Sequence, residues 1–410
     1  MLKKIAVDQL RLGMHLHELG GKWVDHPFWK SRFVLRDARE LAQLRESGVR
    51  ECWIDVSKGA DVPAIEVLAE PAPSTDPAPL TTAAAEAPAS MADELSRAAA
   101  LVRLSRARVQ SLFQEARMGQ ALNAEECLPL VEEIAASVWR NPGALISLAR
   151  LKTHDDYSYM HSVAVCALMV SLSRQFGHDE ARAREAGLAG LLHDMGKAMM
   201  PLDVLNKPGK LTEAEFGIIK SHPQRGHELL EGGTGTPAIA LDVCLHHHER
   251  PDGAGYPFGL HGDAVTLAAR MGSVCDVYDA ITSNRPYKVG WDPADSVSRI
   301  TTWSQAGQFD AAVFAAFVKS LGVYPVGSLV RMRSGRLAVV VEQSATQLLK
   351  PCVKVFYSTK AQMSVAAELV DTSDPRCGDA VAARESNAVW RFPHLDELWA
   401  GRDVLAAAAA

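Results

Sequence analysis

Residues 191–197 read LLHDMGK, so an apolar run ends in an imidazole beside a carboxylate, followed by glycine and lysine. His193 could be a hydrogen-bonded core histidine, and Asp194 could simply end a helix, because both are ordinary structural uses of these residue types. Imidazole nitrogens and carboxylate oxygens are also the groups that bind iron, manganese and zinc in proteins. The pair alone leaves both interpretations open.

Further histidines and another aspartate lie in the same part of the chain: His161, His222, the consecutive histidines 246–248 and Asp276. A helix bundle can direct such side chains from several helices into one interior, and a carboxylate such as Asp194 could bridge two ions. Two ions roughly 3.5 to 4 Å apart stabilise the charge that develops during in-line displacement at phosphorus. The series therefore favours metal-assisted hydrolysis of a phosphate ester.

The elements that must position these residues are mainly helices. Helical hydrophobic patterns dominate the middle of the chain, whereas the first sixty residues alternate like short strands around one helix-like stretch, RDARELAQLRESG. Near the end, SLVRM, RLAVVVEQ and CVKVFYS read as strands before a helix at HLDELWAG. The expected organisation is a small α+β N-terminal module at 1–60, an Ala/Pro-rich linker at 61–93, a connecting helix at 94–124, a mainly α catalytic domain at 125–322 and a small β-containing C-terminal extension at 323–410.

The connecting helix carries apolar or small residues at alternating three- and four-residue steps, the spacing of a coiled-coil seam. Two alternatives stay open: a homodimer through residues 95–116, or a helix packed on its own domain, because the seam is short and poor in Leu and Ile. The seam positions are Leu95, Ala98, Val102, Ser105, Val109, Leu112 and Ala116.

Composition describes an ordinary globular protein of 410 residues, of which 48% are hydrophobic. The formal net charge of −6 argues against stable binding to nucleic acid or to an anionic membrane. The 7 cysteines are scattered without paired spacing, which predicts no disulfide framework and fits a reducing compartment. Asp8 and Arg11 interrupt any signal-like core near the start, so we expect a cytoplasmic protein.

Three long motifs carry a family resemblance: HDMGKAMMPLDVLNKPGKLTEAEF, HHERPDGAGYPFGL and DVYDAITSNRPYK. Over about residues 150–320 the chain resembles the HD-GYP family of bacterial cyclic-di-GMP phosphodiesterases. WVDHPFW and VRECWIDVSKG in the first sixty residues also resemble an uncharacterised module often found ahead of such domains. The resemblance implies a helical HD-type metal phosphohydrolase bundle.

The resemblance also implies two divalent ions, iron or manganese in the first place and zinc as a further candidate. His246 then becomes an additional neighbour of the ligands. Tyr157 stands where family members with three metals place a glutamate, which favours a two-metal site. The implied metal ligands are His161, His193, Asp194, His222, His247, His248 and Asp276.

The resemblance also implies residues for catalysis and for contact with the substrate. Lys197 is assigned with Asp194 and Asp279 to catalysis, with Asp279 orienting a ligand or Lys197 from one turn after Asp276. Cys244 shares a helical face with two of the histidines, but a small buried hydrophobe is the preferred interpretation. The implied substrate contacts are Lys197, Arg285, Lys288 and the loop residues Gly255, Tyr256 and Pro257.

The activity implied by the resemblance is hydrolysis of cyclic-di-GMP to pGpG, with GMP as a further product. The loop at Tyr256 could instead or additionally receive a signalling protein. Two alternatives remain: a phosphohydrolase of another cyclic dinucleotide, and a non-catalytic cyclic-di-GMP receptor that acts through protein partners.

Overall fold

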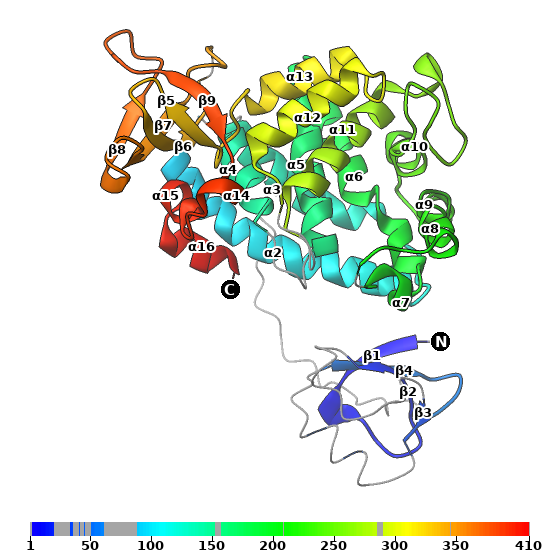
Figure 1. Cartoon of the computed structure of the whole chain (residues 1–410). Helices are drawn as coiled ribbons and strands as arrows, with labels where there is room; N and C mark the ends of the chain where they lie inside the picture. The colour runs from blue at the N-terminus through cyan, green and yellow to red at the C-terminus, as the bar shows by residue number, and fades with distance from the viewer. Residues whose placement is uncertain are drawn as a thin grey trace. The chain divides into compact units, whose positions relative to one another are not determined.

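The computed structural model describes residues 2–19, 33–35, 41, 45, 51–60, 88–151, 157–207, 209–284, 290–344 and 346–409. The chain divides into two compact units, Met1–Thr82 and Ala83–Ala410 (Figure 1).

The N-terminal unit contains an antiparallel sheet of four strands in the order β1-β4-β2-β3. Its apolar face buries Ile5, Leu16 and Ile54, so the expected alternation of apolar and polar residues is confirmed. The helix expected at RDARELAQLRESG lies almost entirely outside the described residues. The strands are β1 (Leu2–Ala6), β2 (His15–Leu19), β3 (Phe33–Val34) and β4 (Glu51–Asp55), with the short 3-10 helix η1 (Val7–Gln9) after β1.

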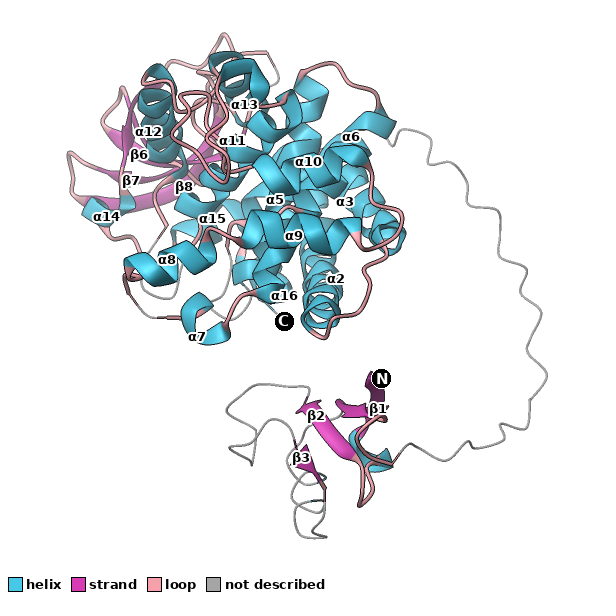
Figure 2. Ribbon diagram, turned by 90° about the vertical axis from the view of Figure 1, so that its right-hand side faces the viewer, coloured by secondary structure: helices cyan, strands magenta, loops and turns pink. Residues whose placement is uncertain are grey.

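The second unit is built mainly of helices, as the sequence predicts (Figure 2). In chain order they are α2 (Met91–Arg117), η3 (Ala124–Cys127), α3 (Leu128–Arg140), α4 (Pro142–Ala149), α5 (Tyr157–Gln175), α6 (Glu180–Leu192), η4 (Met195–Met199), α7 (Leu202–Leu205), α8 (Glu213–Ile219), α9 (His222–Glu231), α10 (Ala238–His246), η5 (Gly262–Ala264), α11 (Leu267–Thr282), α12 (Pro293–Gln305) and α13 (Ala311–Leu321).

Helix α5 runs through the centre of this unit and packs against α2, α4, α6 and α11. Every residue from Met160 to Ser173 is buried, so this part of the helix is covered on all sides rather than along one stripe. Its long uncharged stretch is therefore explained by burial in the core. Among the described residues, no helix combines the length and the hydropathy needed to cross a membrane.

The seam of α2 is covered by its own unit. All seam positions except Leu112 are buried, and their apolar members belong to the core shared with α5. On another side, α16 (Arg402–Ala409) packs along α2, where Arg106 Nη2 donates to Ala408 O at 2.9 Å. The structure thus has the helix packed on its own unit, which was the second of the two alternatives.

The C-terminal extension forms an antiparallel sheet of five strands in the order β8-β7-β6-β5-β9. Three of its strands match the sequence prediction, whereas β8 and β9 were not predicted. Leu337, Phe356 and Trp399 belong to the bundle's core, so the extension and the helices fold around common apolar side chains. The elements are β5 (Leu329–Met332), β6 (Arg336–Glu342), β7 (Cys352–Ser358), β8 (Met363–Asp371), β9 (Val381–Glu385), α14 (Asn387–Trp390) and α15 (Leu395–Ala400).

Candidate metal centre

The predicted metal ligands come together from five parts of the bundle, most of them at helix ends. All are buried except His248, whose side chain is 21% exposed. His161 lies in α5, His193 and Asp194 lie between α6 and η4, His222 begins α9, His247 and His248 follow α10, and Asp276 lies in α11.

Two glycines allow these segments to approach one another. A Cβ atom on Gly196 would lie 1.8 Å from the His222 carbonyl oxygen, so η4 and α9 touch through their backbones. A Cβ atom on Gly226 would lie 2.6 Å from Cys244 Sγ, at the contact of α9 with α10. Because real Cβ atoms do not come this close to other atoms, only glycine fits at these crossings.

The two carboxylate oxygens of Asp194 face different histidines. Asp194 Oδ2 lies 3.4 Å from the Nε2 atoms of both His161 and His193. Asp194 Oδ1 lies 3.2 Å from His222 Nε2 and 3.8 Å from His247 Nε2. One carboxylate therefore stands between two groups of imidazoles, as a bridging ligand must.

Each group is completed by a further ligand. The ligand atoms of His161, His193 and Asp276 lie within 4.8 Å of one another, and so do those of His222, His247 and His248. His161 Nε2 is 3.0 Å from Asp276 Oδ1. Two neighbouring ligands on one octahedral ion are about 3 Å apart when each is bound at about 2.1 Å. The spacing therefore fits two ions.

The hydrogen bonds of the ring nitrogens identify the tautomers. Nδ1 of His193, His222 and His247 lies 2.8 to 3.0 Å from backbone carbonyl oxygens, which can only accept, so Nδ1 carries the proton. In the neutral rings Nε2 then presents a lone pair. The Nε2 atoms of His222 and His247 are 3.3 Å apart, and two facing lone pairs repel unless a cation lies between them.

Two buried polar atoms support the same conclusion. Among the described residues, neither His193 Nε2 nor Asp194 Oδ1 has a hydrogen-bond partner. Buried acceptors without donors are rare and costly, whereas a bound cation satisfies them directly. The donor set, its spacing and its unmatched atoms all fit a dinuclear metal centre.

The surroundings of Asp194, His247 and His248 favour the forms of these side chains that bind metal. Although burial opposes ionisation, the Lys197 ammonium and the His193 ring hold the pKa of Asp194 well below its usual value. Burial and the neighbouring His248 ring hold the pKa of His247 well below its usual value, and burial lowers the pKa of His248 to about 3. Both carboxylate and neutral imidazole are what a metal ion requires.

Asp279 lies directly behind a ligand. Its Oδ2 accepts from His161 Nδ1 at 2.6 Å, and its Oδ1 accepts from Ser283 Oγ at 3.2 Å. Burial alone would lower the pKa of His161, but the Asp276 and Asp279 carboxylates raise it above its usual value. A carboxylate in this place fixes the ring's orientation and makes Nε2 more basic.

Lys197 and Cys244 occupy different positions around the centre. The Lys197 ammonium forms an ion pair with Asp194 Oδ2 and remains 21% exposed, so it stands between the ligands and solvent. Cys244 is fully buried beside Gly226, and burial and Asp194 raise the pKa of its thiol. The thiol form that follows is a poor metal ligand.

The DGAGYP loop lies against the same centre. The Tyr256 ring stacks on the His248 ring with centroids 4.6 Å apart, and Lys220 Nζ lies 5.3 Å from the Tyr256 centroid. Gly255 passes so close to the backbone of Glu249 and Arg250 that a Cβ atom there would lie 2.4 Å from Arg250 N. Pro257 follows Tyr256 in the loop and is partly exposed.

Sequence reasoning missed the role of Glu249. This carboxylate is fully buried, and its two oxygens accept from the backbone nitrogens of Phe258 at 2.6 Å and Leu260 at 3.0 Å. It therefore ties the loop to the end of α10. The signal was its place in HHE, directly after two ligands, where a buried carboxylate must have a partner.

Some predicted site residues either lie outside the described residues or lie apart from the proposed ligands. Arg285 and Lys288 lie outside the described residues, and so does the side chain of Tyr157, the first residue of α5. The Nδ1 atom of His246 lies 2.8 Å from Asp242 Oδ1, so His246 pairs with a residue outside the proposed ligand set.

Comparison with known proteins gives matches along the whole chain. Residues 2–127 match a domain of unknown function (DUF3391), and residues 130–313 match an HD domain. A cyclic di-GMP phosphodiesterase of Pseudomonas aeruginosa is 51% identical over 98% of this chain and 96% of its own length.

Two other relatives each match less than half of this chain. A cyclic di-GMP phosphodiesterase response regulator of Xanthomonas campestris is 39% identical over 45% of this chain and 50% of its own length. A 3′3′-cGAMP-specific phosphodiesterase of Vibrio cholerae is 32% identical over 41% of this chain and 39% of its own length. Among solved structures, an HDG"Y"P protein of Bdellovibrio bacteriovorus matches 77% of this chain and 98% of its own with a TM-score of 0.46 and 15% identity.

Proposed function

The chain belongs to the HD-GYP family, and from this premise we propose that it is a metal-dependent phosphodiesterase that hydrolyses cyclic di-GMP to linear pGpG. The observation that carries the proposal is the position of Asp194, whose two oxygens face two separate groups of imidazoles. A carboxylate between two ions is the arrangement that two-metal phosphoesterases use.

His161, His193 and Asp276 would hold one ion, and His222, His247 and His248 would hold the other. Imidazole and carboxylate ligands suit iron, manganese and zinc. The family resemblance makes iron or manganese the preferred metal, with zinc as a further candidate. When bound, such ions act as Lewis acids toward phosphoryl oxygens and lower the pKa of water.

The chain's own side chains would bind and orient the substrate. The Lys197 ammonium, paired with Asp194 at the exposed edge of the centre, would exchange part of that contact for a phosphate oxygen. Arg285 and Lys288 would contact a phosphate as well. The loop of Gly255, Tyr256 and Pro257 would border the bound dinucleotide, and Phe258 beside it, 56% exposed, offers an apolar contact for a signalling protein.

The test is a product analysis. Protein purified without oxygen, and analysed for metal, is incubated with cyclic di-GMP or with 3′3′-cGAMP, and the products are separated by chromatography. The proposal expects close to two ions per chain and release of pGpG, with any GMP appearing later. Preference for 3′3′-cGAMP would reassign the substrate, and binding without turnover would make the protein a receptor.

The variant Asp194→Ala tests the bridging role in the same assay. Removing the shared carboxylate should lower metal content and turnover together, because both groups of imidazoles lose a ligand. Full metal content and full activity in this variant would reject the bridging role.

A further inference from the structure

A large cavity lies away from the metal centre, between the bundle and the C-terminal extension. Its volume is about 910 Å³, and its walls come from α12, the end of α11, β9 and the segment from α14 to α15. None of the metal ligands lines it. This cavity, the α12–β9 pocket, has a polar wall that includes Arg150, Trp291, Asp295, Arg299, Arg384 and Asp396.

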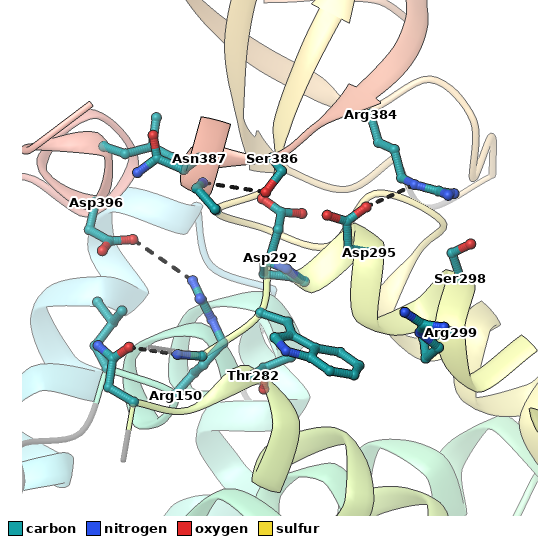
Figure 3. A pocket seen from close by; sticks show the side chains of 18 of the residues that line it. Arg150, Thr282, Asp292, Asp295, Ser298, Arg299, Arg384, Ser386, Asn387 and Asp396 are labelled. Atoms are coloured by element: carbon teal, nitrogen blue, oxygen red, sulfur yellow. Dashed lines mark hydrogen bonds and ion pairs between the residues drawn. The ribbon is translucent and has the colours of Figure 1, made fainter. Parts of the chain in front are cut away.

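Three guanidinium groups reach the pocket from different elements. Figure 3 shows Arg150 beside Asp396 on one side, with Arg299 and Arg384 near Asp295 and Ser298 on the other. Arg384 Nε is 2.9 Å from Asp295 Oδ1, whereas Arg150 Nη2 is 3.8 Å from Asp396 Oδ1. Guanidinium forks are well shaped for binding a phosphate group.

Arg150 is the strongest indication that the α12–β9 pocket binds an anion. Its side chain is only 12% exposed, and within the described part of the chain its buried Nη2 has no hydrogen-bond partner. Buried guanidinium donors are costly to leave unmatched, and a carboxylate at 3.8 Å is too far to satisfy one. An anion in the pocket would supply the acceptor.

The pocket is larger than a bare anion requires and falls in the range of small-molecule sites. Trp291 adds a flat aromatic surface, and the guanidinium of Arg299 lies over its ring at 5.5 Å from the centroid. Indole and guanidinium planes are the surfaces on which nucleobases stack. The same pocket thus combines donors for a phosphate with a surface for a base.

We propose that the α12–β9 pocket binds a nucleoside monophosphate, with the phosphate on the arginines and the base on the wall formed by Trp291 and Arg299. The three aspartates of the wall, Asp292, Asp295 and Asp396, offset the three arginines, which disfavours a highly charged polyphosphate. The proposal concerns binding at a second site and does not depend on which substrate the metal centre hydrolyses.

The experiment titrates GMP, as the probe, into the metal-loaded full-length protein in a calorimeter. The double variant Arg299→Ala, Arg384→Ala removes two guanidinium groups from exposed positions, so the core is left intact. We expect wild type to bind GMP, and the double variant to bind it about tenfold or more weakly, since hydrogen bonds to charged groups are worth that much. Guanosine, which lacks the phosphate, should bind to wild type more weakly than GMP does, because it makes none of the contacts with the three arginines.

Arg376→Ala is the matched control, because Arg376 is 90% exposed in the same extension and pairs only with Asp374 at 2.8 Å among its described contacts. It should bind GMP like wild type. Equal GMP binding by wild type and the double variant would overturn the proposal, because any observed binding would then belong to the metal centre. An equal loss in Arg376→Ala would also overturn it by assigning the effect to general charge.

Discussion

At the scale of single residues, the centre depends on which atom of each imidazole is protonated. Backbone carbonyls fix Nδ1–H in His193, His222 and His247, but His161 uses the Asp279 carboxylate instead. A carboxylate is the stronger acceptor and adds negative charge behind the ring. His161 is therefore the ligand whose basicity a single side-chain change can alter without removing any ligand.

Asp279→Asn should reduce metal affinity about 10- to 100-fold while leaving all the proposed ligands in place, because the amide is neutral and can also turn a donor toward Nδ1. Competition with a chromogenic chelator measures the change. Asp242→Asn is the control, since Asp242 pairs with His246 at 2.8 Å in the same way but outside the ligand set. If Asp279→Asn held metal as tightly as wild type, Asp279 would have no orienting role.

At the scale of elements, the centre depends on how closely η4, α9 and α10 approach. Gly196 is the tightest point, since the space for its Cβ atom is occupied by the His222 carbonyl. Gly217, in α8, has no atom within 4 Å of the corresponding position. The two glycines therefore differ in what an added methyl group would do.

Gly196→Ala should separate η4 from α9 and thereby lower metal content and activity, because Asp194 and His222 would move apart. Gly217→Ala should instead raise the free energy of unfolding by about 0.5 to 1 kcal/mol, because alanine costs less backbone entropy in a helix. Metal analysis and urea denaturation of both variants distinguish the effects. Normal metal content in Gly196→Ala would contradict the close backbone contact.

Glu249→Gln tests the loop on the other side of the centre. The amide keeps one acceptor, but its NH₂ group would face the backbone N–H of Phe258 or Leu260, which costs about 1 to 3 kcal/mol. We expect kcat/KM for cyclic di-GMP to fall about tenfold, with metal content unchanged. Glu228→Gln, at a carboxylate whose side chain is 63% exposed, should have no effect. Loss of metal in Glu249→Gln would place its role at the ligands instead.

The sequence predicted the elements that carry a local pattern and missed those that depend on partners. Helix α5 and strands β5 to β7 have hydrophobic patterns in their own sequences that indicate burial. Strand β8 has nearly all of its residues exposed, so no alternation marks it, and it is a strand because it pairs with β7. Likewise the motifs named the proposed metal ligands, but the position of Asp194 between two groups of imidazoles follows only from the crossing of helices far apart in the chain.

At the scale of the whole molecule, the proposed metal ligands all lie in the unit Ala83–Ala410, and its core is continuous from α2 to α15. The expected boundary at residue 125 would cut through this core. Glu94 illustrates the connection, because it is fully buried and its carboxylate accepts from Arg140 Nε at 2.6 Å and from Ser137 Oγ at 2.7 Å. We therefore expect α2 to stabilise the bundle as well as to connect it to the N-terminal unit.

Two truncations test this organisation. A chain of residues 83–410 should fold, bind two ions and hydrolyse cyclic di-GMP, because it keeps the whole core.

A chain of residues 125–410 loses α2 and with it Leu95, Leu101, Val102, Val109 and Phe113, all of them buried. Each such side chain contributes about 1.5 to 3 kcal/mol on burial, so their sum is comparable to the 5 to 15 kcal/mol that holds a typical domain folded. Removing α2 also exposes the apolar side of α5, so the shorter chain should aggregate or melt far below the longer one in thermal denaturation. A stable, metal-loaded 125–410 chain would show that α2 is only a connection and that the bundle from residue 125 is sufficient.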